Sequence, residues 1–111
     1  MSGTAAVIVS WNGLPWLQRH ASGWQAQREA FARIIVVDNH STDGTKDWLE
    51  AHSAVESVRL PRNLGFAAGA NAGIRAALMN DAVDAVALIN NDVLLDPDWN
   101  RAARAALFSA D

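Results

Sequence analysis

The chain has 111 residues, of which 50% are hydrophobic and 19% charged, with a formal net charge of −3 at pH 7. These values fit a single soluble domain spanning residues 1–111 and exclude a disordered chain. The absence of cysteine excludes disulfides and thiol chemistry, and the slight negative charge argues against nucleic acid as a partner. No apolar run approaches a membrane span, and no basic segment leads into a signal region. We expect a cytoplasmic location, with peripheral contact at the inner face of the membrane left open.

Short apolar runs alternate with helical patterns along the chain. The expected elements are a strand over residues 5–10, a helix over about 14–24, a strand over 34–37, a helix to about 52, an edge strand over 55–60, an Ala-rich helix ending near 80, a strand over 85–89, and a helix ending near 108. Residues 25–32 fit either a helix end or a loop. This alternation predicts a Rossmann-like, three-layer α/β/α fold with a mostly parallel sheet in the order 3-2-1-4.

Helix starts carry their own signals. Thr42 or Asp43 can cap the second helix. Asp96 can cap the last helix, with Pro97 at its first position.

Polar loops follow the first, second and fourth predicted strands. They are Ser10–Gly13, Asp38–His40 and Asn90–Asp92. In the order 3-2-1-4 the chain reverses direction between strands one and four, so the three loops should surround one crevice at the carboxyl ends of the strands, where ligands bind in such sheets. Asp38 ends a strand that we expect to be buried on both faces, and it is the first site candidate.

A dinucleotide site is the first alternative for this crevice. It requires G-x-G-x-x-G after the first strand, but that turn contains one glycine and the bulky residues Trp11, Leu14 and Trp16. A P-loop is also absent, because the only lysine is Lys46 and no G-x-x-x-x-G-K-[ST] motif exists. Both phosphate-binding interpretations are disfavoured.

Four blocks together resemble glycosyltransferase family 2, most closely its rhamnosyltransferase-like members. The blocks are VIVSWNG, IIVVDNHSTDGT, RNLGFAAGANAGI and ALINNDVLLDPDW, in the family's order. The resemblance implies the GT-A fold and an inverting, metal-dependent transfer of a hexose. The donor would be a nucleotide-diphosphate sugar, and the acceptor a saccharide or a lipid-linked molecule.

The resemblance assigns nucleotide-binding roles to the first two loops. Asp38 matches the carboxylate that accepts a hydrogen bond from the base. Because a carboxylate only accepts, it suits uridine, thymidine or guanosine diphosphates. Ser10, Trp11 and Asn12 match the loop that lines base and ribose. Two structural alternatives stay open: Asp38 capping its own loop, and Trp11 packing in the core.

The third block supplies further donor-binding candidates. Arg62 can reach a phosphate, Asn63 can bind base or ribose, and Gly65 belongs to the same segment. Gly65, Gly69 and Gly73 recur every four residues, which also fits a helix face that approaches the sheet closely.

The fourth block stands where the family carries its D-x-D metal motif. Asp92 is the expected ligand of Mg²⁺ or Mn²⁺, with a loop aspartate that caps a turn as the structural alternative. Asn90 is at best a weak amide ligand or a hydrogen-bond donor to the sugar, and both Asn90 and Asn91 are assigned to the nucleotide sugar. With one carboxylate, we expect the ion to bind mainly together with the nucleotide.

The resemblance places the catalytic base in a second half of the domain, beyond Asp111. We therefore expect this chain to be the donor-binding half of a glycosyltransferase, with the base unknown. The alternative is a non-catalytic nucleotide-binding or assembly module with half a GT-A fold. A homodimer through the edge of the apolar strand 85–89 is a further expectation.

Overall fold

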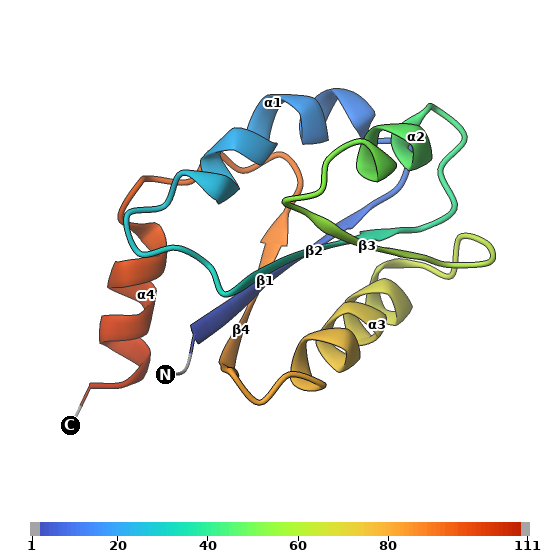
Figure 1. Ribbon diagram of the computed structural model, residues 1–111. Helices are drawn as coiled ribbons and strands as arrows, with labels where there is room; N and C mark the ends of the chain where they lie inside the picture. The colour runs from blue at the N-terminus through green and yellow to red at the C-terminus, as the bar shows by residue number, and fades with distance from the viewer. Residues whose placement is uncertain (1–2, 110–111) are drawn as a thin grey trace.

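The computed structural model describes residues 3–109. These residues form a parallel sheet between two layers of helices (Figure 1). The elements are β1 (Gly3–Ser10), α1 (Leu14–Gln25), β2 (Arg33–Asp38), α2 (Thr45–Glu50), β3 (Glu56–Arg59), α3 (Phe66–Leu78), β4 (Val83–Asn90) and α4 (Trp99–Leu107). The strand order is β3-β2-β1-β4, and neighbouring strands are parallel. The predicted fold class and strand order are confirmed. None of the helices within residues 3–109 has the length and hydrophobicity needed to cross a bilayer.

The central strands β1 and β2 are buried on both faces. Along β1, Ile8 joins an apolar cluster with α1 and α2, whereas the adjacent Val7 joins a cluster with α3. Val36 and Val37 repeat this alternation along β2. Figure 1 shows α1 and α2 over one face of the sheet and α3 over the other. Continuous apolar runs therefore predicted these strands correctly, because each has helices above and below it.

Helix α3 packs closely on the sheet through its glycines. A Cβ added to Gly69 would lie 2.7 Å from a methyl of Val9, and one added to Gly73 would lie 2.4 Å from a methyl of Val7. Two of the three regularly spaced glycines thus permit close helix–sheet contact. Gly65 instead precedes the helix with a φ of +87°, a conformation that favours glycine.

The predicted cap of α2 is wrong by one or two positions. Its N-cap is Gly44, which has a φ of +92° and no side chain to offer. Asp43 still contributes, because its carboxylate accepts hydrogen bonds from the Thr45 N–H and hydroxyl, at 3.2 and 2.6 Å. The left-handed Gly44 occupies the cap position itself, so Asp43 reaches the helix from one residue before the cap.

The predicted start of α4 is also wrong. Its N-cap is Asp98, so Pro97 lies outside the helix. Asp96 forms a turn instead: its carboxylate accepts from Asp98 N–H at 2.8 Å, and its carbonyl accepts from Trp99 N–H at 2.9 Å. Local acceptors can organise a turn as readily as a cap.

The segment after α1, for which the sequence left helix and loop open, is a loop. The Gln27 amide donates to the carbonyl of Asp96 at 2.7 Å and accepts from Asn100 N–H at 2.8 Å. Arg28 N–H donates to the carbonyl of Pro97 at 2.9 Å. The loop therefore fixes the start of α4.

Strand β4 pairs only with β1 among the described residues. Its apolar residues are not equally covered: Ala87 and Ile89 are buried, whereas Leu88 is 45% exposed. One face of this edge strand is therefore partly open.

Candidate functional site

The loops after β1 and β4 meet at the carboxyl end of the sheet. The amide of Asn91 donates a hydrogen bond to the Ser10 hydroxyl at 3.1 Å. Gly13 lies against the same pair, since a Cβ there would be 2.5 Å from the Asn91 amide nitrogen and 2.7 Å from the Ser10 oxygen. The structure thus brings together two predicted site residues that are 81 positions apart in the sequence.

The loops after β1 and β2 are also joined by hydrogen bonds. Asn12 N–H donates to the Ser41 hydroxyl at 2.9 Å, and the Asn12 side-chain oxygen accepts from Thr42 N–H at 2.8 Å. Asn12 has a φ of +49°, a conformation that asparagine tolerates better than most residues. Its side-chain oxygen is therefore already used within the protein. The adjacent Trp11 is 56% exposed, so its ring is open to a ligand.

Asp43 also joins the loops after β1 and β2 through hydrogen bonds. Its carboxylate accepts from Leu14 N–H at 3.0 Å, in addition to its bonds with Thr45. Partial burial opposes ionisation, but these hydrogen bonds outweigh it and lower the pKa of Asp43. One ionised side chain therefore satisfies N–H groups in the first turns of both α1 and α2.

Asp38 ends β2 and is buried, with 1% of its side chain exposed. One carboxylate oxygen accepts from Ser41 N–H at 2.9 Å, and the other accepts from Arg59 Nη1 at 2.6 Å. A carboxylate offers about four acceptor sites, so capacity for a further donor remains. The Asp38 side chain also lines a small hollow of about 70 Å³ together with Arg59, Lys46 and Glu50.

Asn39 connects this end of β2 to the segment before α3. Its side-chain oxygen accepts from Leu64 N–H at 3.0 Å, and its amide donates to the carbonyl of Gly65 at 2.9 Å. Asn63 accepts from Gly65 N–H at 2.9 Å and is exposed, as is Arg62. The segment containing Arg62, Asn63 and Gly65 is thus tied to the loop after β2 through Asn39, a residue that the sequence did not single out.

The loop after β4 presents oxygen donors. Asn90 and Asp92 are exposed, and Val93 N–H donates to the carbonyl of Asn90 at 3.3 Å. Within residues 3–109 there is no group of three or more His, Cys, Asp or Glu side chains that could hold a metal ion. Oxygen donors suit Mg²⁺ or Mn²⁺, but one carboxylate is too few for a site made by protein alone. The donor set fits a metal whose other ligands come from a bound diphosphate.

The sequence predictions missed four residues that organise this end of the sheet: Asn39, Ser41, Asp43 as a bridge, and Arg59. Asn39 and Ser41 lie in the motif that contains Asp38, and their polar character at a strand end was the available signal. Arg59 had no comparable signal, because its partner depends on the alignment of β3 with β2.

A parallel sheet in the order 3-2-1-4 with polar loops joined at its carboxyl end is a Rossmann-like α/β domain. The chain belongs to glycosyltransferase family 2, whose family model, described as "Glycosyl transferase family 2", matches residues 5–107. No curated protein sequence matches the chain significantly.

Solved structures share the fold. S. aureus TarS 1-349 in complex with UDP superposes with a TM-score of 0.75 at 18% identity, over 95% of this chain and 31% of that one. S. aureus TarS 1-349 in complex with UDP-GlcNAc gives a TM-score of 0.72 at 19% identity, over 97% and 31%. Mannosyltransferase PcManGT from Pyrobaculum calidifontis, in complex with GDP-Man and Mn²⁺, gives 0.70 at 21% identity, over 100% and 33%. The chain thus spans about a third of the length of these solved chains.

Proposed function

We propose that this chain binds a nucleotide-diphosphate sugar at the carboxyl end of its sheet, as the donor-binding part of an inverting glycosyltransferase. The observation that carries the proposal is the joining of the family's motif loops at one place: Asn91 contacts Ser10, and Asn12 contacts Ser41. Ligands in open α/β sheets bind where such strand ends meet. The described residues are assigned to donor binding rather than to activation of the saccharide or lipid-linked acceptor.

Asp38 and Trp11 are the proposed base-binding pair. The free acceptor capacity of Asp38 suits the imide N–H of uracil or thymine, or the N1–H of guanine. The exposed ring of Trp11 can stack on a base, which contributes about 1–3 kcal/mol in nucleic-acid complexes. Arg62 is proposed for a phosphate and Asn63 for base or ribose, since both are exposed on the segment that Asn39 ties to this loop.

The loop Asn90–Asp92 is proposed to face the diphosphate and the sugar. Asp92 would hold Mg²⁺ or Mn²⁺ together with the diphosphate, with Asn90 and Asn91 near the sugar. A divalent metal neutralises the charge that develops on a departing diphosphate. The protein's part is to hold this loop, which it does through the Asn91–Ser10 hydrogen bond.

The ligands of the similar structures support this choice of donor. UDP, UDP-GlcNAc and GDP-Man with Mn²⁺ are bound by proteins of the same fold. Each carries an imide or N1–H donor on its base. Because the motifs resemble those of rhamnosyltransferase-like members, we propose a rhamnosyl donor as the first sugar to test.

Calorimetric titration with five nucleoside diphosphates tests the proposal. In the presence of Mn²⁺, uridine, thymidine or guanosine diphosphate should bind more tightly than adenosine and cytidine diphosphates. Equal affinities for all five, or no binding of any, would contradict it.

Assembly through β4 is a second candidate role, supported by the partly exposed Leu88 on an edge strand. A two-fold pairing of β4 with a second copy would cover this edge. Leu88→Lys should then shift the mass seen by light scattering toward monomer. Lysine at Ala87 would be a poorer test, because Ala87 is buried and the substitution would also disturb the core. A wild-type monomer at high concentration would rule this role out.

A further inference from the structure

Arg59 is held against the proposed base-binding carboxylate by the register of the sheet. Asp38 and Arg59 are direct partners in the parallel pairing of β2 with β3. Arg59 Nη1 donates to Asp38 at 2.6 Å, and Nη2 donates to the carbonyl of Ser41 at 3.2 Å. The Arg59 side chain is 30% exposed, whereas that of Asp38 is 1% exposed. The planar guanidinium thus spans a carboxylate and a loop carbonyl at once.

These contacts fix more than one side chain. Ser41 N–H donates to the oxygen of Asp38 that Arg59 leaves free, so the carboxylate is oriented from both sides. The Ser41 hydroxyl then accepts from Asn12 N–H in the loop that carries Trp11. Arg59 on β3 is therefore connected, through Asp38 and Ser41, to the loop after β1.

We propose that Arg59 is a positioning residue for nucleotide recognition. It compensates the buried charge of Asp38, fixes which acceptor sites of that carboxylate remain for the base, and holds the Ser41 turn that supports the Trp11 loop. This inference rests on the proposed function, because it concerns how the same site selects a base with an N–H donor. It does not place Arg59 in contact with the ligand.

Two substitutions separate this role from a general effect on folding. Arg59→Gln removes the charge and the planar fork, whereas Arg59→Lys keeps a charge that cannot reach Asp38 and the Ser41 carbonyl in the same bidentate way. Arg101→Gln is the matched control, since Arg101 is exposed on α4 and the substitution removes the same charge. Each variant is first compared with wild type by its thermal midpoint and its amide NMR spectrum.

The measurement is calorimetric titration with uridine diphosphate, cytidine diphosphate and inorganic pyrophosphate in the presence of Mn²⁺. For Arg59→Gln we expect uridine diphosphate to bind about tenfold more weakly, as for loss of a charge-assisted hydrogen bond in a site. Because the loss concerns recognition of the base, the ratio of uridine diphosphate affinity to cytidine diphosphate affinity should fall toward one. The affinity for pyrophosphate, which has no base, should stay close to that of wild type. Arg59→Lys should be intermediate, and Arg101→Gln should behave as wild type.

The outcomes distinguish this inference from the function on which it rests. Wild-type protein that binds no nucleotide would overturn both. Wild-type protein that prefers uridine, combined with unchanged or increased preference in a folded Arg59 variant, would overturn the positioning role alone. If Arg59→Gln does not fold, the preference measured for Arg59→Lys decides, and a value equal to wild type overturns the role.

Discussion

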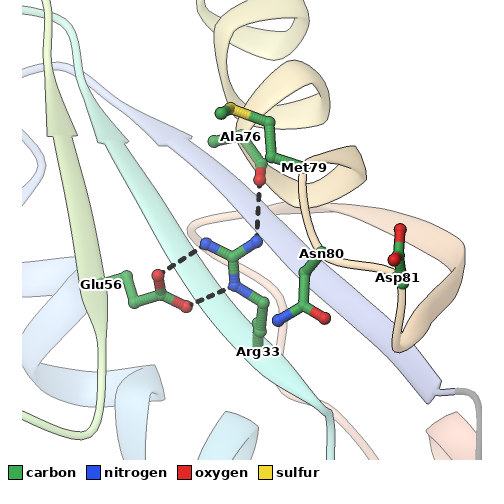
Figure 2. A pocket seen from close by; sticks show the side chains of 6 residues that line it. All are labelled: Arg33, Glu56, Ala76, Met79, Asn80 and Asp81. Carbon is green, nitrogen blue, oxygen red and sulfur yellow. Dashed lines mark hydrogen bonds and ion pairs between the residues drawn. The ribbon is translucent and has the colours of Figure 1, made fainter.

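Two arginine–carboxylate pairs join β2 to β3, one at each end of the sheet, and they differ in the further partners of the arginine. At the amino end, Arg33 of β2 faces Glu56 of β3 (Figure 2). At the carboxyl end the charges are exchanged, with Asp38 on β2 and Arg59 on β3. The two pairs connect the same strands, so their difference lies in their hydrogen bonds and neighbours.

At the amino end, all three side-chain nitrogens of the arginine donate hydrogen bonds. Arg33 donates from Nε and Nη2 to the two oxygens of Glu56, each at 2.7 Å, and from Nη1 to the carbonyl of Ala76 at 2.7 Å. The hydrogen bond from Arg33 lowers the pKa of Glu56 against the opposing effect of burial, and the same bond raises the pKa of Arg33. The pair lines a broad hollow of about 790 Å³ that Met79, Asn80 and Asp81 share. The bidentate pair and the helix-end carbonyl leave this arginine little to offer a ligand, so it acts as a brace between β2, β3 and α3.

At the carboxyl end, the arginine divides its donors between the Asp38 carboxylate and the carbonyl of Ser41. Each Asp38 oxygen accepts one hydrogen bond from the protein, from Ser41 or from Arg59. The neighbouring hollow is only about 70 Å³ and is lined by residues of β2, β3 and α2. Asp38 is connected through Ser41 to the loop after β1. In this molecule, connection to the loops at the strand ends therefore marks a candidate site better than the size of a hollow does.

Substitution of Asp38 should give the largest effect. Asp38→Asn keeps the shape but replaces an acceptor with a donor that faces Arg59, so uridine diphosphate should bind at least about tenfold more weakly and its advantage over cytidine diphosphate should shrink. The free energy of unfolding should fall by about 1–3 kcal/mol, because a buried charge-assisted hydrogen bond is lost. Calorimetry and urea unfolding measure the two effects. Full base discrimination in the variant would show that Asp38 serves only the loop.

Substitution of Asp92 should weaken Mn²⁺-dependent nucleotide binding without changing the free energy of unfolding appreciably. In wild type, Mn²⁺ should strengthen nucleotide binding while binding weakly alone. Asp92→Ala should abolish that gain and change the free energy of unfolding by less than about 0.5 kcal/mol, since Asp92 is exposed. Asp81→Ala is the control, an exposed aspartate at the other end of the sheet. Titrations of nucleotide with and without Mn²⁺ decide the matter, and an undiminished gain in Asp92→Ala would remove this residue from the site.

Loss of the amino-end pair should affect stability alone. Arg33→Gln removes the bonds to Glu56 and to the end of α3, and should cost about 1–2 kcal/mol of unfolding free energy. Nucleotide affinity should not change. Lys46→Gln breaks an exposed pair with Glu50 and should cost less than about 0.5 kcal/mol. A clear loss of nucleotide binding in Arg33→Gln would contradict the contrast between the two ends.

The sequence allowed the strand order to be predicted, because buried strands appear as continuous apolar runs and alternate with helices. The glycine spacing left a close approach of α3 as one alternative, which holds at Gly69 and Gly73 but not at Gly65, which precedes the helix. Of the candidate site, the sequence indicated which loops would converge, and the contact of Ser10 with Asn91 agrees with that. The nucleotide and metal roles of the individual residues stay predictions.

Other features could not be predicted from the local sequence pattern. The alternation in residues 55–60 does not say that Arg59 lies opposite Asp38, since that depends on the register of β3 against β2. The cap of α2 was mistaken because a left-handed Gly44 intervenes between Asp43 and the helix. Both depend on how the backbone is aligned in space, which residue types alone do not specify.

The smallest expected effect is the change in stability with acid, and it tests the Arg33–Glu56 pair most directly. The pKa of Glu56 is lowered from its ordinary value of 4.5 by Arg33, so the unfolded chain binds this proton more readily than the folded one. The contribution of the pair is therefore fully present above the ordinary value and is lost as the pH falls through the folded pKa. Asp43, whose pKa is lowered from 3.8, adds a loss of the same sign at lower pH.

Urea unfolding at a series of pH values between about 6 and 3 measures this response. Stability should fall with acid, and Glu56→Gln should make that fall shallower. The difference should be modest, because the Glu56 side chain is 49% exposed and solvent screens the pair. Glu50→Gln, which changes an exposed glutamate on α2, should leave the curve unaltered. A Glu56→Gln curve parallel to that of wild type would mean that the hydrogen bonds of Arg33 to the α3 carbonyls, rather than its pairing with Glu56, make the amino end rigid.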